Sequence, residues 1–142
     1  MKRTILIAAV AVLGMSGVAL AGNDVDINQV GNSNEAYADQ FGEGNWIEID
    51  QISNSNYVEA SQKGYKNEID VYQRGGNGNK VNLVEQKGAY HDADIDQNGN
   101  GNVIYAVKQY GKDNNAKVNQ AGNSNKAQVY QASMHHHHHG SN

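Results

Sequence analysis

The sequence predicts an all-β fold, a two-sheet β-solenoid of five coils and ten strands with cross-β, amyloid-type stacking. Three observations lead to this fold: glutamine recurs mostly every 11 residues, aliphatic residues alternate between the glutamines, and nearly every predicted turn contains a glycine. The chain has 142 residues, with 16 Gly, no Pro and no Cys. The absence of Cys excludes disulfides and Cys-based zinc sites. The absence of Pro leaves every backbone N–H available for strand pairing.

Both termini are set apart before the repeats are interpreted. Lys2 and Arg3 precede a short apolar run, and Ala19 to Ala21 fit an A-x-A cleavage site. Residues 1–21 are therefore predicted to be a secretory signal peptide. The run from His135 to His139 indicates an expression tag over residues 134–142. A repeat domain over residues 22–133 remains, and a secreted domain without disulfides needs another source of stability.

The repeat unit is N-x-h-x-h-x-Q, where h is an aliphatic residue, and the units are joined by turns of mostly x-G-x-x. Units such as residues 45–51 and 67–73 have the period of a β-strand, which presents alternate side chains to opposite faces. Two strands and two turns make a coil of about 22 residues, and such repeats indicate stacked units ~4.8 Å apart. The amide positions of the units are Asn23, Gln29, Asn34, Gln40, Asn45, Gln51, Asn56, Gln62, Asn67, Gln73, Asn79, Gln86, Gln97, Asn102, Gln109, Asn114, Gln120, Asn125 and Gln131, with His91 in place of one asparagine.

These amides are predicted to flank the core as ladders that serve self-assembly. Stacked carboxamides hydrogen-bond along the stacking axis to their like neighbours. A simpler interpretation is that they are polar residues beside turns, where Asn is common. That interpretation accounts for the asparagines but not for a glutamine at the end of every strand, so the ladder is favoured.

The second residue of most turns is glycine, which permits a positive φ and a tight reversal. These glycines are Gly31, Gly42, Gly64, Gly75, Gly88, Gly99, Gly111 and Gly122. Ser53 takes this place in one turn, and we expect a looser turn there. Residues 79–86 and 102–109 each contain one extra residue after the second aliphatic. These two strands are neighbours in one sheet, so the bulge of one is expected to lie against the bulge of the other. That match would place Glu85 near Lys108.

The interior can be predicted column by column, and its side chains are small, so the two sheets are expected to lie close together. One sheet contributes Val25, Ile47, Ile69, Ala93 and Ala116, beside Ile27, Ile49, Val71, Ile95 and Val118. The other contributes Ala36, Val58, Val81, Ile104 and Ala127, beside Ala38, Ala60, Leu83, Ala106 and Val129.

The two ends of the stack decide the predicted function. A stack of strands leaves unpaired N–H and C=O groups at each end, and soluble proteins cover such edges with proline, charge or a cap. The sequence has no proline and predicts no capping helix, and its terminal units 23–29 and 125–131 match the interior ones. Each end is therefore predicted to be a template for another copy. A heterologous contact, top on bottom, generates an open fibre.

Charge is distributed unevenly in a way that favours head-to-tail contact. Residues 22–62 carry eight acids and no Lys or Arg, whereas residues 63–131 carry seven acids and nine bases. Stacking would bring Lys117 and Lys126 near Asp26 and Glu35 of the next copy. An outward acidic column is expected to oppose assembly, so we expect faster growth in acid or with divalent cations; it comprises Asp26, Glu48, Asp70 and Asp94.

Other classes of function find little support. His91 stands in a ladder position, and acidic pairs such as Glu48 and Asp50 lie on a predicted exposed face with no pocket implied. We predict no enzyme activity and no cofactor or metal site, although the run from Asp92 to Asp96 leaves weak cation binding open. The 15 acids and nine bases of the repeat domain disfavour nucleic-acid binding. The apolar run near the N-terminus is too short for stable membrane insertion.

The N-x5-Q units, joined by x-G-x-x and repeated in pairs behind a secretory signal, closely resemble bacterial curli subunits over residues 23–131. The resemblance implies a secreted, extracellular protein of a diderm bacterium, exported through an outer-membrane apparatus. It implies assembly with other copies into functional amyloid fibres of the biofilm matrix, which aid adhesion and aggregation. A nucleator subunit is an implied partner. The intact terminal unit 125–131 favours the major, fibre-forming subunit; the minor nucleator and a soluble monomeric β-solenoid adhesin remain alternatives.

Overall fold

The computed structural model describes residues 10–11 and 22–133, and all of their regular elements are β-strands. The predicted fold is confirmed, because ten strands form two parallel sheets that wind as a β-solenoid of about 5 turns. Equivalent glutamines in neighbouring coils are 22 to 24 residues apart, close to the predicted repeat. The ten strands are β2 (Asp24–Val30), β3 (Glu35–Glu43), β4 (Trp46–Ile52), β5 (Tyr57–Tyr65), β6 (Glu68–Arg74), β7 (Lys80–Ala89), β8 (Asp92–Asn98), β9 (Val103–Lys112), β10 (Asn115–Ala121) and β11 (Lys126–Ala132).

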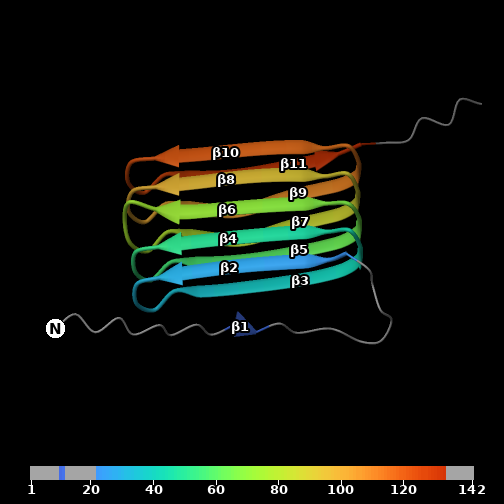
Figure 1. The fold of residues 1–142 in the computed structure, drawn as a ribbon. Helices are drawn as coiled ribbons and strands as arrows, with labels where there is room; N and C mark the ends of the chain where they lie inside the picture. Colours follow the sequence, from blue (N-terminus) through green and yellow to red (C-terminus); the bar gives the residue numbers. More distant parts are fainter. Residues whose placement is uncertain (1–9, 12–21, 134–142) are drawn as a thin grey trace, which may run out of the picture.

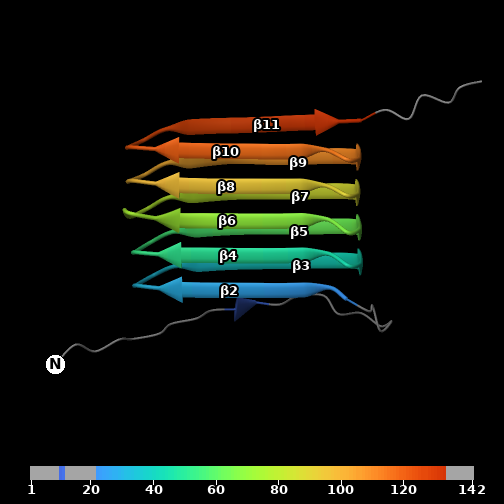
Figure 2. The ribbon, with the colours of Figure 1, turned by 45° about the horizontal axis from the view of Figure 1, so that its top comes forward.

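Each sheet is built from every second strand of the chain. The β2 sheet has the order β2-β4-β6-β8-β10, and the β3 sheet has the order β3-β5-β7-β9-β11. Neighbouring strands in both sheets are parallel. Figures 1 and 2 show the two layers and the single stacking axis. We call the β2 and β3 end the N-terminal end of the stack, and the β10 and β11 end the C-terminal end.

A short additional strand lies at the N-terminal end of the stack. β1 (Val10–Ala11) pairs in parallel with Ala36 and Tyr37 of β3 (Figure 1). The sequence did not predict this strand, which falls within the predicted signal peptide. The rest of that peptide and the predicted tag lie outside the described residues. Over the part of the chain that is described, no helix has the length and apolar character that a membrane span requires.

The core forms between the two sheets from the alternate aliphatic positions. Ile47, Ile49 and Val58 in the interior coils are fully buried. Val25 and Ile27 at the N-terminal end are only partly buried, although they belong to the same columns. Ala127 and Val129 at the C-terminal end are likewise partly buried. The predicted columns are thus present, and their burial is incomplete at the N-terminal end in the β2 sheet and at the C-terminal end in the β3 sheet.

The bulges of β7 and β9 lie on one another, as predicted, but their position within the strand was predicted wrongly. Val81 pairs with Ile104, and the next core pair is Val84 with Val107, with no relative shift between the two strands. Val84 is fully buried, whereas Leu83, the predicted core residue, is only half-buried.

The glutamine at the end of each strand explains this difference. Gln86 is in register with Gln62 and Gln109, and the core position lies two residues before each glutamine. In β7 that residue is Val84, and in β9 it is Val107. The extra residue therefore lies before the second core aliphatic. Ala106 remains buried beside the bulge, but it does not occupy the core column.

The turn at Ser53 is not looser than the others, contrary to prediction. Ser53 has a φ of 127°, close to the 124° of Gly31 one coil below. The turn stacked on it, residues 74–78, is one residue longer than the equivalent turns. Gly75 has a positive φ of 73°, but Gly76 makes the close approach to the next coil, since a Cβ there would lie 2.3 Å from the carbonyl oxygen of Gly99. The predicted Gly75 thus has the positive φ of this turn, and Gly76 makes the close approach to the backbone of the next coil.

Candidate functional site

The glutamines form two hydrogen-bonded ladders, one in each sheet. In every step the Nε2 of one glutamine donates to the Oε1 of the glutamine nearer the C-terminal end. In the β2 sheet the steps are Gln29 to Gln51 at 2.6 Å, Gln51 to Gln73 at 2.9 Å, Gln73 to Gln97 at 2.8 Å and Gln97 to Gln120 at 2.7 Å. In the β3 sheet they are Gln40 to Gln62 at 2.9 Å, Gln62 to Gln86 at 2.9 Å, Gln86 to Gln109 at 2.7 Å and Gln109 to Gln131 at 2.9 Å. Both ladders therefore have the same direction.

The second amide hydrogen of most glutamines joins the two sheets. Gln51 Nε2 also donates to the carbonyl oxygen of Glu35 at 3.0 Å, and Gln86 Nε2 donates to that of Glu68 at 2.8 Å. Gln51 and Gln86 are fully buried. A buried amide without partners costs several kcal/mol, on the order of 1–3 per unmet group. These interior amides are satisfied along the axis and across the core, so their burial is tolerated.

The asparagines at the strand starts form ladders in the opposite direction. The backbone N–H of Asn56 donates to Asn34 Oδ1 at 3.0 Å, and that of Asn67 donates to Asn45 Oδ1 at 3.1 Å. In both cases the donor lies nearer the C-terminal end. The same contact recurs at Asn79, Asn102 and Asn125 in the β3 sheet.

His91 fills the place of an asparagine in the β2 sheet. Its backbone N–H donates to Asn67 Oδ1 at 3.2 Å, and the backbone N–H of Asn114 donates to His91 Nδ1 at 3.3 Å. Its Nε2 lies 3.3 Å from the carbonyl oxygen of Lys87. Since Nδ1 accepts a hydrogen bond, the network assigns the ring proton to Nε2. The histidine is buried and continues the ladder.

A third kind of ladder was missed by the sequence analysis. It lies in the turns that follow the strands of the β2 sheet, where a backbone N–H donates to the next asparagine Oδ1 at 2.8 to 3.0 Å. Its members are Asn32, Asn54, Asn77, Asn100 and Asn123. A signal was available, because an asparagine follows each glutamine of this sheet by three or four residues.

The N-terminal end of the stack contains an amide acceptor without a partner among the described residues. Within the described residues, Gln29 Oε1 is buried and has no hydrogen-bond partner. Gln40, at the same end, is only half-buried, whereas Gln62 in the next coil is fully buried. The two glutamines donate to the coil above them, so their oxygens face the open end.

The C-terminal end presents the complementary donors. Gln120 Nε2 donates to the carbonyl oxygen of Val103 at 3.4 Å, and Gln131 Nε2 donates to that of Asn115 at 2.7 Å. In the interior, most glutamines make this contact in addition to the one they donate to the next glutamine. Within residues 22–133 no glutamine lies beyond Gln120 or Gln131 to accept the second hydrogen. One end of the stack thus offers oxygens and the other offers N–H groups, in two matching pairs.

Charged columns run along the outside of the same strands. Asp26, Glu48, Asp70 and Asp94 lie in register, and Lys117 completes that column. Lys117 forms an ion pair with Asp94. Burial, followed by repulsion from Glu68, Glu48, Asp92 and Asp94, raises the pKa of Asp70 to about 6. The acidic column therefore opposes its own stacking, and the lysine at its C-terminal end relieves part of this repulsion.

The predicted contact between Glu85 and Lys108 is confirmed. Lys108 Nζ lies 3.6 Å from Glu85, and Lys87 also pairs with this carboxylate. Tyr110 donates its hydroxyl hydrogen to Glu85 Oε2 at 2.5 Å. Hydrogen bonds from Lys87 and Tyr110 lower the pKa of Glu85. These contacts fix the register of the bulged strands.

The described residues thus form a parallel two-sheet β-solenoid with internal amide ladders and exposed strand edges at its ends, the architecture of a stacking repeat protein. A model of the curlin associated repeat matches residues 21–52, 54–88, 92–122 and 105–132. The chain belongs to the curlin family. This is a family of structural fibre subunits rather than of enzymes. No curated protein and no solved structure gives a significant match to the chain.

Proposed function

We propose that the chain is the major, fibre-forming curli subunit, a secreted structural protein that stacks head to tail into extracellular functional amyloid fibres of the biofilm matrix. The observation that carries the proposal is the complementarity of the two ends. Gln29 and Gln40 offer acceptors at one end, and Gln120 and Gln131 offer donors at the other. A second copy placed on the C-terminal end would extend both glutamine ladders without a change of direction.

The half-buried residues at the two ends support the same arrangement. Asn23 and Gln40 at the N-terminal end, and Asn114, Asn125 and Gln131 at the C-terminal end, are less buried than the equivalent interior residues. Stacking would bury them together with the exposed parts of the aliphatic columns. Burial of apolar area is worth about 25 cal/mol per Å², and the strand edges would gain backbone hydrogen bonds at the same time.

The charged columns favour one orientation of the incoming copy. Lys117 lies in the column of Asp26, and Lys126 lies in the column of Glu35. Head-to-tail stacking would place each lysine beside the acid that begins its column in the next copy. Head-to-head stacking at the N-terminal end would instead bring acids together, which is unfavourable.

β1 affects when stacking can begin. It pairs with β3 at the edge that an incoming copy needs. Removal of the predicted signal peptide, residues 1–21, would remove β1 and free the whole edge of β3. Export through an outer-membrane apparatus, a nucleator partner and a role in adhesion and aggregation are parts of the same proposal, and they rest on membership of the curlin family.

The test is growth of untagged protein at micromolar concentration from sonicated wild-type seeds. We expect thioflavin-positive fibres with a meridional spacing of about 4.7–4.8 Å. A Gln120→Glu and Gln131→Glu double variant replaces both free donors with charged acceptors. It should add to seeds through its intact N-terminal end and then stop growth, even when it is a small fraction of the protein.

The matched control is Asn119→Asp with Gln128→Glu, which makes the same charge changes on the exposed faces of the same two strands. The control should leave elongation within about twofold of the wild-type rate, since screened surface charges contribute little. Equal inhibition by both variants would contradict the ladder mechanism. A stable wild-type monomer would favour the soluble adhesin, and protein that only starts growth of another subunit would favour the nucleator.

A further inference from the structure

Tyrosines on neighbouring coils pack against each other in three pairs, with tilted or edge-to-face rings. Their ring centroids are 5.8 Å apart for Tyr37 and Tyr57, 5.7 Å apart for Tyr65 and Tyr90, and 5.6 Å apart for Tyr110 and Tyr130. The face of an aromatic ring attracts cations. The three pairs can therefore be compared by asking which of them has a cation over its rings.

Two of the pairs hold lysines of the same molecule. Lys66 Nζ lies 5.1 Å from the centroid of Tyr65, and Lys112 Nζ lies 5.3 Å from that of Tyr90. Both of these contacts belong to the pair of Tyr65 and Tyr90. In the pair of Tyr110 and Tyr130, Lys87 Nζ lies 5.6 Å from the centroid of Tyr110. Each of these two pairs therefore already has a lysine of the same chain beside a ring.

The pair formed by Tyr37 and Tyr57 is different. Of the four lysine-to-ring contacts in the described residues, none involves either ring. Lys80 follows Tyr57 along the column, but it does not line the groove beside these rings. Residues 22–62 contain no Lys or Arg at all. The two rings are available to a cation that the chain itself does not supply.

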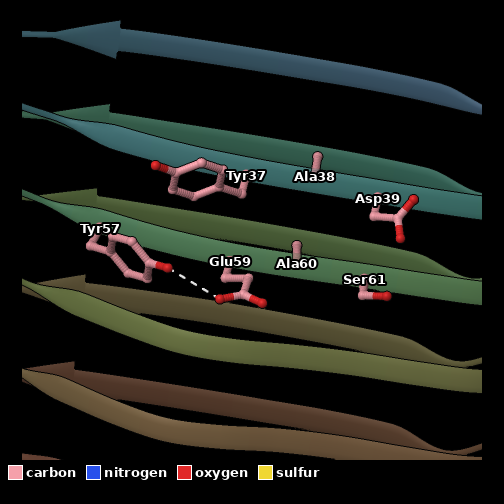
Figure 3. Close-up of a pocket in the computed structure, with 7 residues that line it drawn as sticks. All are labelled: Tyr37, Ala38, Asp39, Tyr57, Glu59, Ala60 and Ser61. Carbon is pink, nitrogen blue, oxygen red and sulfur yellow. Dashed lines mark hydrogen bonds between the residues drawn. The ribbon is translucent and has the colours of Figure 1, made fainter. Parts of the chain in front are cut away.

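The rings form one side of a groove of about 390 Å³ on the outer face of β3 and β5. Figure 3 shows the groove, with Glu59 beside Tyr57 and with Asp39 and Ser61 further along the same two strands. The Tyr57 hydroxyl donates to Glu59 Oε2 at 3.1 Å. Burial, the hydrogen bond to Glu59 and nearby negative charge raise the pKa of Tyr57. All charged groups lining the groove are carboxylates.

We propose that this groove binds a small quaternary ammonium ion of the choline type. Two tyrosine faces would contact the methyl groups, and the carboxylates of Glu59 and Asp39 would balance the charge. A methylated ammonium fits better than a bare one because it has no N–H to satisfy and sheds water at lower cost. One such site occurs per copy, on the outward faces of β3 and β5, whereas the contacts proposed for fibre growth use the free edge of β3.

The experiment is a saturation-transfer NMR titration of the full chain with choline chloride. The control ligand is 3,3-dimethylbutan-1-ol, which has the same shape and no charge. We expect choline to bind with a dissociation constant on the order of 1 mM and the alcohol at least about tenfold more weakly, as expected for about 1–2 kcal/mol of cation–π attraction. Equal binding of the two ligands would overturn the proposal.

Variants locate the site and separate it from general charge attraction. Tyr37→Leu and Glu59→Gln should each weaken choline binding at least about threefold, whereas Tyr37→Phe, which keeps the ring, should bind within about twofold of wild type. Tyr110→Leu, in a pair that already holds a lysine, and Glu48→Gln, on the other sheet, should have no effect. The proposal is wrong if Tyr110→Leu or Glu48→Gln weakens choline binding as much as the groove variants do.

Discussion

Interior coils and end coils of this solenoid share one sequence motif and differ in what their residues contact. Gln51, in the interior, accepts from Gln29 and donates to Gln73 and to Glu35. Gln131, at the C-terminal end, donates to one backbone carbonyl and is half-buried. Position in the stack alone creates this difference. It follows that one kind of substitution should harm the fold in the interior and harm assembly at the ends.

The largest expected effect comes from a Gly→Ala substitution made at two places. At one place it should disrupt the fold, and at the other it should disrupt assembly. A Cβ on Gly64 would lie 1.8 Å from the carbonyl oxygen of Gly88, at a φ of 132°. Gly64→Ala should therefore destabilise the fold by more than about 4 kcal/mol, through steric overlap and backbone strain together. A Cβ on Gly122 would have only Asn125 Nδ2 nearby, at 3.7 Å. Gly122→Ala should cost only about 1 kcal/mol in the soluble chain, through its positive φ.

Within the chain, a Cβ on Gly99 would lie 2.0 Å from the carbonyl oxygen of Gly122 in the next coil. In the proposed fibre, the Cβ of the Gly122→Ala variant would overlap with the backbone of the next copy in the same way. Elongation of wild-type seeds should fall at least about tenfold. The measurements are urea unfolding followed by circular dichroism and seeded thioflavin kinetics. Normal elongation by a folded Gly122→Ala protein would show that copies do not stack on this end.

The second effect concerns the glutamine ladders. Gln73→Leu removes an acceptor for Gln51 and a donor to Gln97 and to the carbonyl oxygen of Tyr57. Leaving these buried groups unmet should cost about 3–5 kcal/mol in urea unfolding. Gln131→Leu should cost less, about 1–2 kcal/mol. It removes an acceptor for Gln109, but Gln109 still donates to the carbonyl oxygen of Asp92, and the surroundings of Gln131 are open to water. Similar losses for the two variants would contradict the contrast between interior and end.

The third effect is a pH dependence centred on Asp70. Its pKa in the folded protein is about 6, above the ordinary value of 3.8. The folded state therefore holds the proton more tightly than the unfolded state. The resulting stabilisation is fully present below about pH 4 and is lost as pH rises through about 6.

Asp70→Asn should remove this dependence and raise stability at pH 7 by about 1 kcal/mol, a value reduced for solvent screening of this half-exposed side chain. Thermal unfolding at pH 4, 5, 6 and 7 checks the prediction. Asp26→Asn, at the exposed end of the same column, is the control and should change the profile less. An unchanged slope between pH 4 and 6 in the Asp70→Asn protein would rule out this carboxyl as its source.

The smallest expected effect tests backbone strain in an interior turn. Ser53 adopts a φ of 127°, in the region that favours glycine. Ser53→Gly should stabilise the protein by about 0.5 kcal/mol, since relief of strain exceeds the added freedom of the unfolded chain. A rise of a few degrees in the melting temperature would agree with this value. A fall would mean that the serine side chain makes a compensating contact.

The sequence was sufficient to predict the solenoid, the two sheets and the aliphatic columns, because every unit repeats the same strand period. It was also sufficient to pair the bulges of β7 and β9, since their extra residues recur one coil apart. It did not locate the bulge within the strand. Counting forward from Asn79 places Leu83 in the core, whereas register with Gln62 places Val84 there. The alternation of side chains does not show whether the asparagine or the glutamine at the ends of a bulged strand determines which residues face the core.

The direction of the ladders also could not be predicted. A carboxamide can donate either way along a column, and the choice depends on the backbone carbonyls of the facing sheet that receive the second hydrogen, such as that of Glu35 for Gln51. The turn ladder from Asn32 to Asn123 was missed for another reason. Asparagine is common in turns, so its recurrence there looked like ordinary turn chemistry.

The opposed directions of the ladders have an electrostatic consequence for a long assembly. Glutamine amides align their dipoles one way along the axis, and the strand-start asparagines align theirs the other way. In an α-helix, by contrast, peptide dipoles add and leave partial charges at the ends. Here the two sets oppose one another instead of adding, and the turn column lies at the surface, where water screens it. A fibre could therefore lengthen without building up a field that would penalise the next addition.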